Sequence, residues 1–221
     1  MKTSKFLLLP ALLSAVIVCA SASRDGGKEI EKLHDSASVI TEFSKMKENL
    51  PTQLMEQYKG IVVIPNMLNA GFGVGAKQGN GIATVKLPNG KWSDPVFVTL
   101  TGGNYGLTST AESVDLILVF QHKSVLTRLK GGDYFVGTDV TDAAGPITIG
   151  SSANSHLSMD AEIYSYSSNN GMLKGLTIDA AKLSIDKKAN AEYYGGPHAL
   201  FGASGNGSVA VKGLTEALKA L

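Results

Sequence analysis

The chain has 221 residues, with 20 lysines and arginines against 19 aspartates and glutamates and a formal net charge of +1 at pH 7. A nearly neutral chain has no overall field that would hold nucleic acid, so we expect no nucleic-acid partner, and any anion binding must come from a local patch. Hydrophobic residues make up 43% of the chain, which is enough to bury one good core, and the length favours a single domain.

The first 22 residues have the composition of a secretory signal peptide. A start that contains lysine leads into a short apolar run, Phe6–Val18, and small residues at Ala20 and Ala22 occupy the positions that signal peptidase inspects. We therefore expect an exported protein that is cleaved after Ala22. The apolar run is shorter than the roughly 20 residues of a membrane-spanning helix. Because no later segment is longer and equally apolar, we expect a soluble or peripheral mature protein.

Cys19 offers a second interpretation of this leader. A lipoprotein signal also ends in cysteine, but Val18 stands where the lipid-transfer machinery usually requires a small residue, so lipidation at Cys19 is the less favoured alternative. Cleavage after Ala22 would leave a mature chain without cysteine, which excludes disulfides, thiol nucleophiles and cysteine-ligated metals. The leader holds two of the basic residues and none of the acidic ones, so the mature net charge would be −1.

Helices are predicted at both ends of the mature chain. Apolar residues recur at spacings of three and four from Asp25 to Leu50, which indicates an amphipathic helix, and Asp35-Ser36 is a candidate break because a capping residue stands there. Pro51 is expected to open a second short helix. We assign residues 23–59 to an N-terminal helical segment packed on the domain, since its mixed-charge face suits packing better than membrane insertion. Val209–Leu221 again has a helical period.

Between these helices the pattern changes to that of strands. Ile61–Ile64 is a β-branched run, closed by Pro65-Asn66, that predicts a buried strand. In Ala70–Gly81 glycines alternate with apolar residues, so a strand there would have one bare face that something must approach closely. The Asn-Gly pair of Pro88–Gly90 predicts a hairpin. Further strands are predicted at Ile82–Leu87, Val96–Leu100, Val114–Phe120, Tyr134–Val140, Ile147–Gly150, Ala161–Tyr166 and Gly175–Lys182, and a short helix at Ser124–Lys130.

This order of elements predicts the fold class α+β. Short strands with glycine-rich turns, bracketed by helices, do not alternate as βαβ units would. We expect a single domain with a mainly antiparallel, glycine-rich sheet or partial barrel, flanked by N- and C-terminal helices. The core of the domain is assigned to residues 60–221.

The residues that could carry catalysis or hold a metal form no recognisable site. The glycine stretch lacks the GxxxxGK[ST] motif and the following helix that would hold a phosphate. Ser184-Ile185-Asp186-Lys187 has Ser-x-x-Lys spacing without its companion motifs, and the four histidines lack metal-ligand spacing. We therefore predict no enzyme, no metal and no cofactor. A hydrolase that uses Ser184 or Ser204 is the weakest alternative.

Six blocks, in order and spacing, resemble the SYLF domain over most of the mature chain. No single block is specific, but the ordered set is. The blocks are GIVVIPNM (Gly60–Met67), GFGVG, GKWSDPVFVTL (Gly90–Leu100), AAGPI (Ala143–Ile147), IYSYSSNNGMLKGLTIDAAKLSID (Ile163–Asp186) and NAEYYG (Asn190–Gly195).

The resemblance implies a noncatalytic lipid-binding domain. In eukaryotic adaptor proteins the SYLF domain binds phosphoinositides and other membrane lipids, and yeast members have been tied to actin. Stand-alone bacterial members are exported and described as lipid-binding. For this chain the resemblance implies peripheral binding of phospholipid or another anionic amphiphile at the bacterial cell envelope, in a periplasmic or outer-membrane-associated protein. An exported protein would ordinarily meet no actin, so actin is not expected as a partner. The alternative is an envelope structural or protein-interaction domain without a lipid ligand.

The sequence nominates a lipid-binding surface without fixing its position. Lysines punctuate the predicted sheet, and cations beside apolar or tyrosine side chains would suit anionic headgroups. Ser168–Gly171 is expected to turn between two strands, with Met172, Leu173 and Lys174 at the tip. The candidate lipid-binding residues are Lys91, Lys174, Lys182, Met172, Leu173, Tyr164 and Tyr166.

Overall fold

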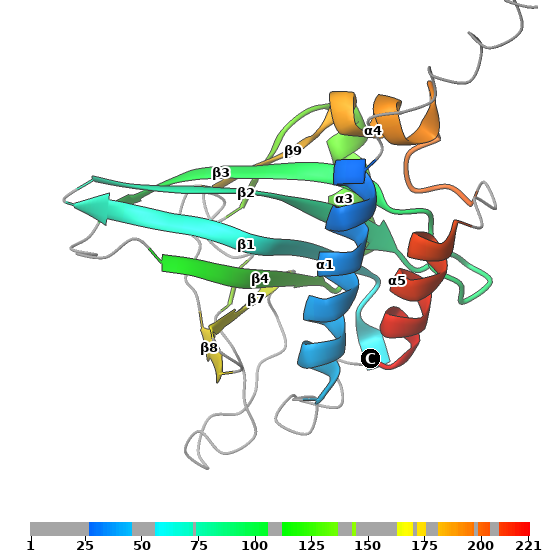
Figure 1. The fold of residues 1–221 in the computed structure, drawn as a ribbon, viewed down its shortest axis with the longest axis horizontal. Helices are drawn as coiled ribbons and strands as arrows, with labels where there is room; N and C mark the ends of the chain where they lie inside the picture. Colours follow the sequence, from blue (N-terminus) through cyan, green and yellow to red (C-terminus); the bar gives the residue numbers. More distant parts are fainter. Residues whose placement is uncertain are drawn as a thin grey trace, which may run out of the picture.

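The computed structural model describes residues 27–45, 56–72, 74–105, 112–136, 143–144, 163–169, 172–175, 181–196, 199–203 and 208–221. Within these ranges, a nine-stranded sheet is flanked by helices (Figure 1). The helices are α1 (Gly27–Lys45), α3 (Lys123–Arg128), α4 (Lys187–Tyr194) and α5 (Val209–Lys219), with the 3-10 helix η2 (Leu129–Gly131). The strands are β1 (Gly60–Phe72), β2 (Val74–Val85), β3 (Val96–Tyr105), β4 (Glu112–Phe120), β5 (Tyr134–Val136), β6 (Ala143–Ala144), β7 (Ile163–Asn169), β8 (Met172–Gly175) and β9 (Ala181–Ile185).

The strand order of the sheet is β5-β9-β3-β2-β1-β4-β7-β6, and β8 pairs with β7. The pairing is antiparallel except between β6 and β7, which are parallel. Since β5 and β6 end the order, the described strands form an open sheet rather than a barrel. The predicted α+β class, with a mainly antiparallel sheet and helices from both ends of the chain, is confirmed.

Each face of the sheet carries an apolar cluster, because successive side chains of a strand point to opposite faces. On one face, α1 and α5 lie across one end of the sheet, as Figure 1 shows, and their apolar sides pack on Ile61, Ile117 and Phe97. On the other face, α3 and η2 contribute Val125 and Leu129 to a second core. The sheet therefore separates two apolar clusters.

A bulge in β1 corrects the prediction that Pro65-Asn66 closes this strand. The strand continues to Phe72, and one extra residue is accommodated between Ile64 and Met67. Asn66 takes a left-handed φ of 50°, and its N–H donates to Asp115 Oδ1 at 2.9 Å. A proline and a residue with positive φ are both tolerated at a bulge, so the strand does not have to end there.

The glycines of β2 make room for this bulge. A Cβ on Gly79 would overlap the Ile64 side chain, and a Cβ on Gly81 would overlap the Val63 carbonyl oxygen. The sequence predicted that something approaches the bare face of this strand closely. For Gly79 and Gly81, the group that does so is β1, through its backbone and side chains. The structure therefore explains them by packing within the sheet.

Other predicted bounds change because tertiary pairing extends or joins elements. The helix α1 runs through the candidate break at Asp35-Ser36, since Ser36 is completely buried and faces the core. The strand β3 continues past Leu100 because its ladder with β2 continues to Tyr105. The leader, Pro51 and the predicted strand Ile147–Gly150 lie outside the described residues.

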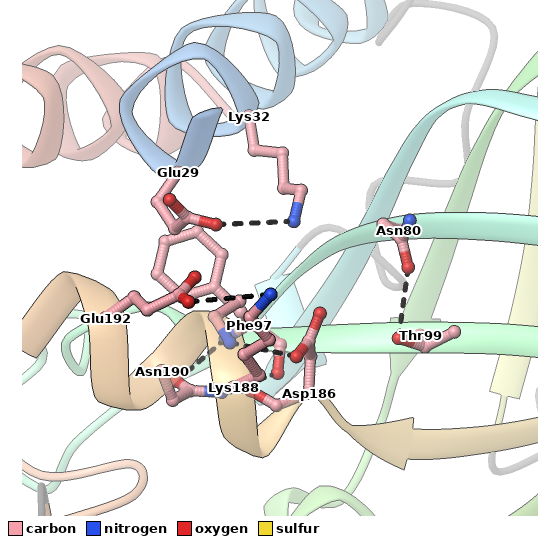
Figure 2. A network of polar contacts seen from close by, with 10 residues as sticks. Glu29, Lys32, Asn80, Phe97, Thr99, Asp186, Lys188, Asn190 and Glu192 are labelled. Atoms are coloured by element: carbon pink, nitrogen blue, oxygen red, sulfur yellow. Dashed lines mark hydrogen bonds and ion pairs between the residues drawn. The ribbon is translucent and has the colours of Figure 1, made fainter. Parts of the chain in front are cut away.

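A single asparagine ties α4 to β3 (Figure 2). The Asn190 amide accepts from the Phe97 N–H at 3.1 Å and donates to the Phe97 carbonyl at 2.8 Å. It also donates to the Asp186 carbonyl at 2.8 Å, while the Asp186 carboxylate caps the helix by accepting from the Ala189 N–H at 2.9 Å. Since Asn190 is buried, these bonds take the place of the hydrogen bonds to water that its amide and the Phe97 backbone groups would make in solvent.

We predict that Gly81→Ala destabilises the protein by about 1–3 kcal/mol, because the added methyl overpacks the bulge of β1. The matched control is Gly213→Ala in α5, where nothing lies within 4 Å of the added methyl. In this helix interior the same change should stabilise the protein by about 0.5–1 kcal/mol. Denaturant unfolding of both variants measures the difference, and equal effects would contradict the packing argument.

We also predict that Asn190→Ala costs about 1–3 kcal/mol, because it leaves the buried Phe97 N–H without its partner, while the Phe97 carbonyl keeps the bond that it accepts from the Asp186 N–H at 3.0 Å. Asn80→Ala is the control, since exposed Asn80 only accepts one bond from the Thr99 hydroxyl, at 3.0 Å. That change should stay within about 0.5 kcal/mol. Thermal and denaturant unfolding provide the measurement; a neutral Asn190 variant would show that the link is dispensable.

Candidate binding site at the basic end of the sheet

Three neighbouring strands end at the same level of the sheet. Gly60 of β1 lies opposite both Val85 of β2 and Phe120 of β4. The residues just outside this row continue the pairing, since the Lys59 N–H donates to the Phe120 carbonyl at 2.7 Å and the Lys86 N–H donates to the Lys59 carbonyl at 2.8 Å. Register alone therefore places two lysines side by side.

The segment after β4 adds further basic residues at this level. His122 is the N-cap residue of α3 and Lys123 is its first residue. Lys59, His122 and Lys123 are exposed, whereas Lys86 is half-buried. We call these four residues the basic end of the sheet.

The predicted Asn-Gly hairpin is confirmed at the same place. The Gly90 N–H donates to the Leu87 carbonyl at 2.9 Å, and the Leu87 N–H donates to the Lys91 carbonyl at 2.8 Å. Gly90 has a φ of 76°, the left-handed conformation that a three-residue hairpin loop requires. This turn, Leu87–Lys91, joins Lys86 to Trp92, which form a β-bridge.

Lys86 lies against two aromatic rings. Its Nζ is 3.9 Å from the centre of the Tyr58 ring and 5.4 Å from that of Trp92, distances at which a cation is attracted to the π face. Burial lowers the pKa of the Lys86 amine below its ordinary 10.5, and the charge of Lys59 lowers it further. Burial raises the pKa of Tyr58 to about 12, so that the phenol stays neutral at physiological pH.

A surface pocket of about 630 Å³ opens beside this lysine. We call it the basic pocket; its walls include Lys59, Lys86, His122 and Lys123, with Leu87 and Pro88 of the turn. None of its described lining residues is acidic. Like charges that share a pocket repel one another, and a bound anion would relieve that repulsion. The basic pocket is therefore suited to an anionic group.

A second pocket, of about 530 Å³, lies on the α5 side of the same turn. We call it the aromatic pocket; its walls include Tyr58, Trp92, Leu218 and Leu221, with Lys91 and Lys219. It shares Lys86 and Gly90 with the basic pocket. Its combination of rings, leucines and cations suits an apolar group that is close to a negative charge.

A third pocket, of about 500 Å³, lies between η2 and α4 and carries charges of both signs. Its walls include Lys130, Asp133 and Lys187. The neighbouring Ser184 hydroxyl and the Lys182 ammonium lower the pKa of the Asp133 carboxyl, so this pocket keeps a negative charge of its own. An anion would therefore find a less favourable environment there than in the basic pocket.

The structure separates the lysines that the sequence nominated. Lys91 is exposed and lines the aromatic pocket. Lys182 is on β9 near the opposite edge of the sheet from β7, and its Nζ lies 3.2 Å from Asp133 Oδ2. Lys174 is on β8, which pairs with β7. With strands spaced by about 4.8 Å, five steps in the order from β9 to β7 keep the last two lysines far apart.

The two nominated tyrosines do not form an exposed surface. Tyr164 and Tyr166 are 0% and 1% exposed, and both belong to the core under α1. The Tyr166 ring lies 5.4 Å from that of Phe43. The sequence pattern correctly placed them in a strand, but the expectation that they accompany surface lysines is wrong because α1 covers this face.

The β7–β8 hairpin is tighter than expected. Asn169 already pairs with Met172, so the strands reach closer to the turn than the predicted Ser168–Gly171 loop would allow. Met172, Leu173 and Lys174 are therefore strand residues of β8 rather than residues of a loop tip. Their side chains, and the residues Leu176 and Ile178, lie outside what the structure describes.

The basic end includes residues that sequence reasoning did not select. Lys86 is among the lysines that punctuate the predicted sheet, but it and Lys59, each taken alone, are ordinary charges next to a strand. The available signal was positional: Lys59 precedes a predicted strand, and Lys86 and Lys123 lie at or just beyond the ends of two others. In an antiparallel sheet such ends meet, once the pairing partners are known.

The described residues supply little for catalysis or metal binding. No group of three or more histidine, cysteine or acidic side chains among them is placed to hold a metal ion. Ser184 lies on β9 and Lys187 begins α4, while Ser204 is outside the described residues. Within the described ranges, none of the helices has the length and apolar character needed to cross a membrane.

Comparison with known proteins identifies the relatives of this chain. It is 27% identical over 166 residues to the SH3 domain-containing YSC84-like protein 1 of Bos taurus, which covers 72% of this chain and 48% of the bovine protein. It is 25% identical over 151 residues to the LAS seventeen-binding protein 3 of Saccharomyces cerevisiae, which covers 66% of this chain and 32% of the yeast protein. The chain thus spans about half the length, or less, of these curated relatives.

A family model confirms the resemblance that the six sequence blocks indicated. The model, Ysc84, is described as "Las17-binding protein actin regulator" and matches residues 101–221, more than half of the chain. The match begins within β3, at Thr101, and includes β4 and all elements after it. The chain therefore belongs to the Ysc84 family of SYLF-domain proteins.

Proposed function

We propose that this protein binds phospholipid or another anionic amphiphile, without catalysis, through the basic end of its sheet. The observation that carries the proposal is the basic pocket, where three lysines and a histidine converge and no described lining residue is acidic. Each cation near an acidic membrane contributes about 1 kcal/mol of binding free energy. The lipid-binding role that the SYLF resemblance implies agrees with this chemistry.

The proposed location is the bacterial cell envelope. Its support is the signal-peptide pattern of the first 22 residues, which would place the protein in the periplasm or at the outer membrane. A peripheral contact fits an exposed basic pocket, because cations on a surface can reach headgroups without insertion of the fold. Lys174, Met172 and Leu173 remain proposed lipid contacts at a second place, and Lys91 and Lys182 remain proposed cationic ones.

A protein partner is the second candidate. The family description names Las17 binding and actin regulation, and the yeast relative is named a LAS seventeen-binding protein. These words concern the relatives, and the proposed export of this chain argues against actin itself. A pull-down from envelope extract, with binding that survives removal of lipid, would favour an envelope protein as the ligand instead.

We predict that the protein floats with vesicles that contain phosphatidylglycerol and that the triple variant Lys59→Gln, Lys86→Gln, Lys123→Gln does so roughly 100-fold more weakly, since three cations contribute about 3 kcal/mol. The control is Lys28→Gln, Lys188→Gln, Lys212→Gln, which removes the same charge from exposed lysines that line neither pocket. Flotation at low salt measures both. Failure of the unaltered protein to float with acidic or with neutral vesicles would refute the proposed function.

We further predict that binding to these vesicles weakens as the pH rises from neutrality toward 10.5, earlier than for a variant with Lys86→Arg. The lowered pKa means that Lys86 loses its charge below 10.5, whereas arginine keeps its charge and still stacks on the rings. Tyr58 stays neutral over this range. The other titratable groups in the two pockets are Lys59, Lys91, His122, Lys123 and Lys219; Glu216 is paired with Lys219, and Glu56 lines an adjoining pocket with Lys59 and His122.

The lowered pKa of Lys86 affects folding stability in the opposite direction from vesicle binding, so the two measurements can be told apart. The folded state binds fewer protons than the unfolded state in this pH window, so Lys86 makes folding more favourable as the pH rises. Weaker binding at high pH would therefore not reflect unfolding through Lys86. Identical pH midpoints for the unaltered protein and the arginine variant would show that Lys86 does not contact the anion.

A further inference from the structure

The turn Leu87–Lys91 stands between two pockets of different chemistry. On the α3 side is the basic pocket, and on the α5 side is the aromatic pocket. Their volumes, about 630 and 530 Å³, are each within the range of small-molecule sites. Because both include Lys86 and Gly90 in their walls, they meet at the turn.

Two residues, Lys86 and Gly90, form the junction between the pockets. Gly90 is exposed and has no side chain, so nothing on that residue rises between the pockets. Lys86 is in the walls of both pockets, and its Nζ lies 3.9 Å from the centre of the Tyr58 ring, which belongs to the aromatic pocket. A single lysine side chain therefore borders both sides of the turn.

The aromatic pocket adds what a purely ionic site would lack. Trp92 and Leu221 are half-buried in its walls, next to the buried Tyr58 and Leu218, and exposed apolar surface gains free energy when it buries an apolar group. Lys91 is in its walls and would favour a nearby negative charge, whereas the Nζ of Lys219 is already paired with Glu216 Oε1 at 2.7 Å. A flat basic patch that only attracts a membrane surface would need no apolar pocket of this kind.

We propose that one ligand molecule spans the turn, with a phosphate or similar anionic group in the basic pocket and an alkyl chain or ring in the aromatic pocket. The inference rests on the proposed function and narrows its ligand to a monomeric amphiphile that has one anionic head and one slender apolar part. The protein then binds such a molecule individually, in addition to any contact with a membrane surface.

Trp92 supplies the measurement, because it is the only tryptophan of the chain and lines the aromatic pocket. Three probes are titrated against its fluorescence, each below its micelle concentration: inorganic phosphate, octyl glucoside and octyl phosphate. Octyl phosphate should bind at least about tenfold more tightly than either of the others, since only it fills both pockets. No advantage of octyl phosphate over inorganic phosphate would overturn the inference.

A variant that fills one pocket tests the arrangement directly. Thr215→Phe places a ring in the aromatic pocket, so octyl phosphate should fall to the affinity of inorganic phosphate, which itself should be unchanged. Val209→Phe is the control, because Val209 is 80% exposed on the same helix and lines neither pocket. Lys59→Gln should weaken both phosphate probes. Thermal unfolding verifies that each variant is folded.

The outcomes keep the inference separate from the proposed function. If vesicles that contain phosphatidylglycerol bind but octyl phosphate has no advantage, the ligand does not span the turn and the proposed function stands. If neither vesicles nor the phosphate probes bind, both fail. A loss of inorganic phosphate binding in Thr215→Phe would also overturn the inference, because it would show that the two pockets are not independent halves of one site.

Discussion

The register of β1 with its two neighbours is the constraint on which the rest of the structure depends. With Gly60 opposite both Val85 and Phe120, three strands end together, and the residues just outside them are forced into one neighbourhood. The same register divides apolar side chains between the α1–α5 face and the α3 face of the sheet. Core packing and site geometry therefore have one origin, because shifting β1 by a residue would exchange its faces.

Gathering cations at one end of a sheet costs free energy, and the surroundings of Lys86 show how that cost is limited. The Tyr58 and Trp92 rings lie 5.7 Å apart and offer π faces to its ammonium, which partly replace the lost water. The lowered pKa shows that the compensation is incomplete. Such a residual imbalance is typical of binding sites, where the missing charge is supplied by the ligand.

The fold was predictable wherever local rules operate over a few residues. The Asn-Gly turn and the period of α5 depend on neighbours in the chain, and both were predicted correctly. The bulge at Pro65-Asn66 was missed because it depends on the glycines of β2, which accommodate it from across the ladder. Strand-ending residues and bulge residues have the same composition, so the sequence alone could not separate them.

Less of the candidate site was predictable, because it is assembled from strand ends that are distant in sequence. Alternation placed Tyr164 and Tyr166 on one face of β7, but it could not tell which face α1 covers. Lys91 is one of the lysines that punctuate the predicted sheet, and the structure places it with Lys86 in the walls of one pocket. Lys59 becomes a candidate only when the strand pairing places it beside Lys86, and that pairing cannot be inferred from the residue alone.

The bulge of β1 also affects how relatives of this chain can be compared. Ile64 and Met67 are three positions apart yet face the same core, while Leu68 is left 47% exposed. The extra residue thus reverses the alternation of inward and outward side chains at Met67 and Leu68, relative to the part of the strand before the bulge. In a relative that lacks one residue at this point, the inward-facing positions after the bulge would be numbered one lower. A one-residue alignment gap there would therefore keep the same side chains on the same face of the sheet.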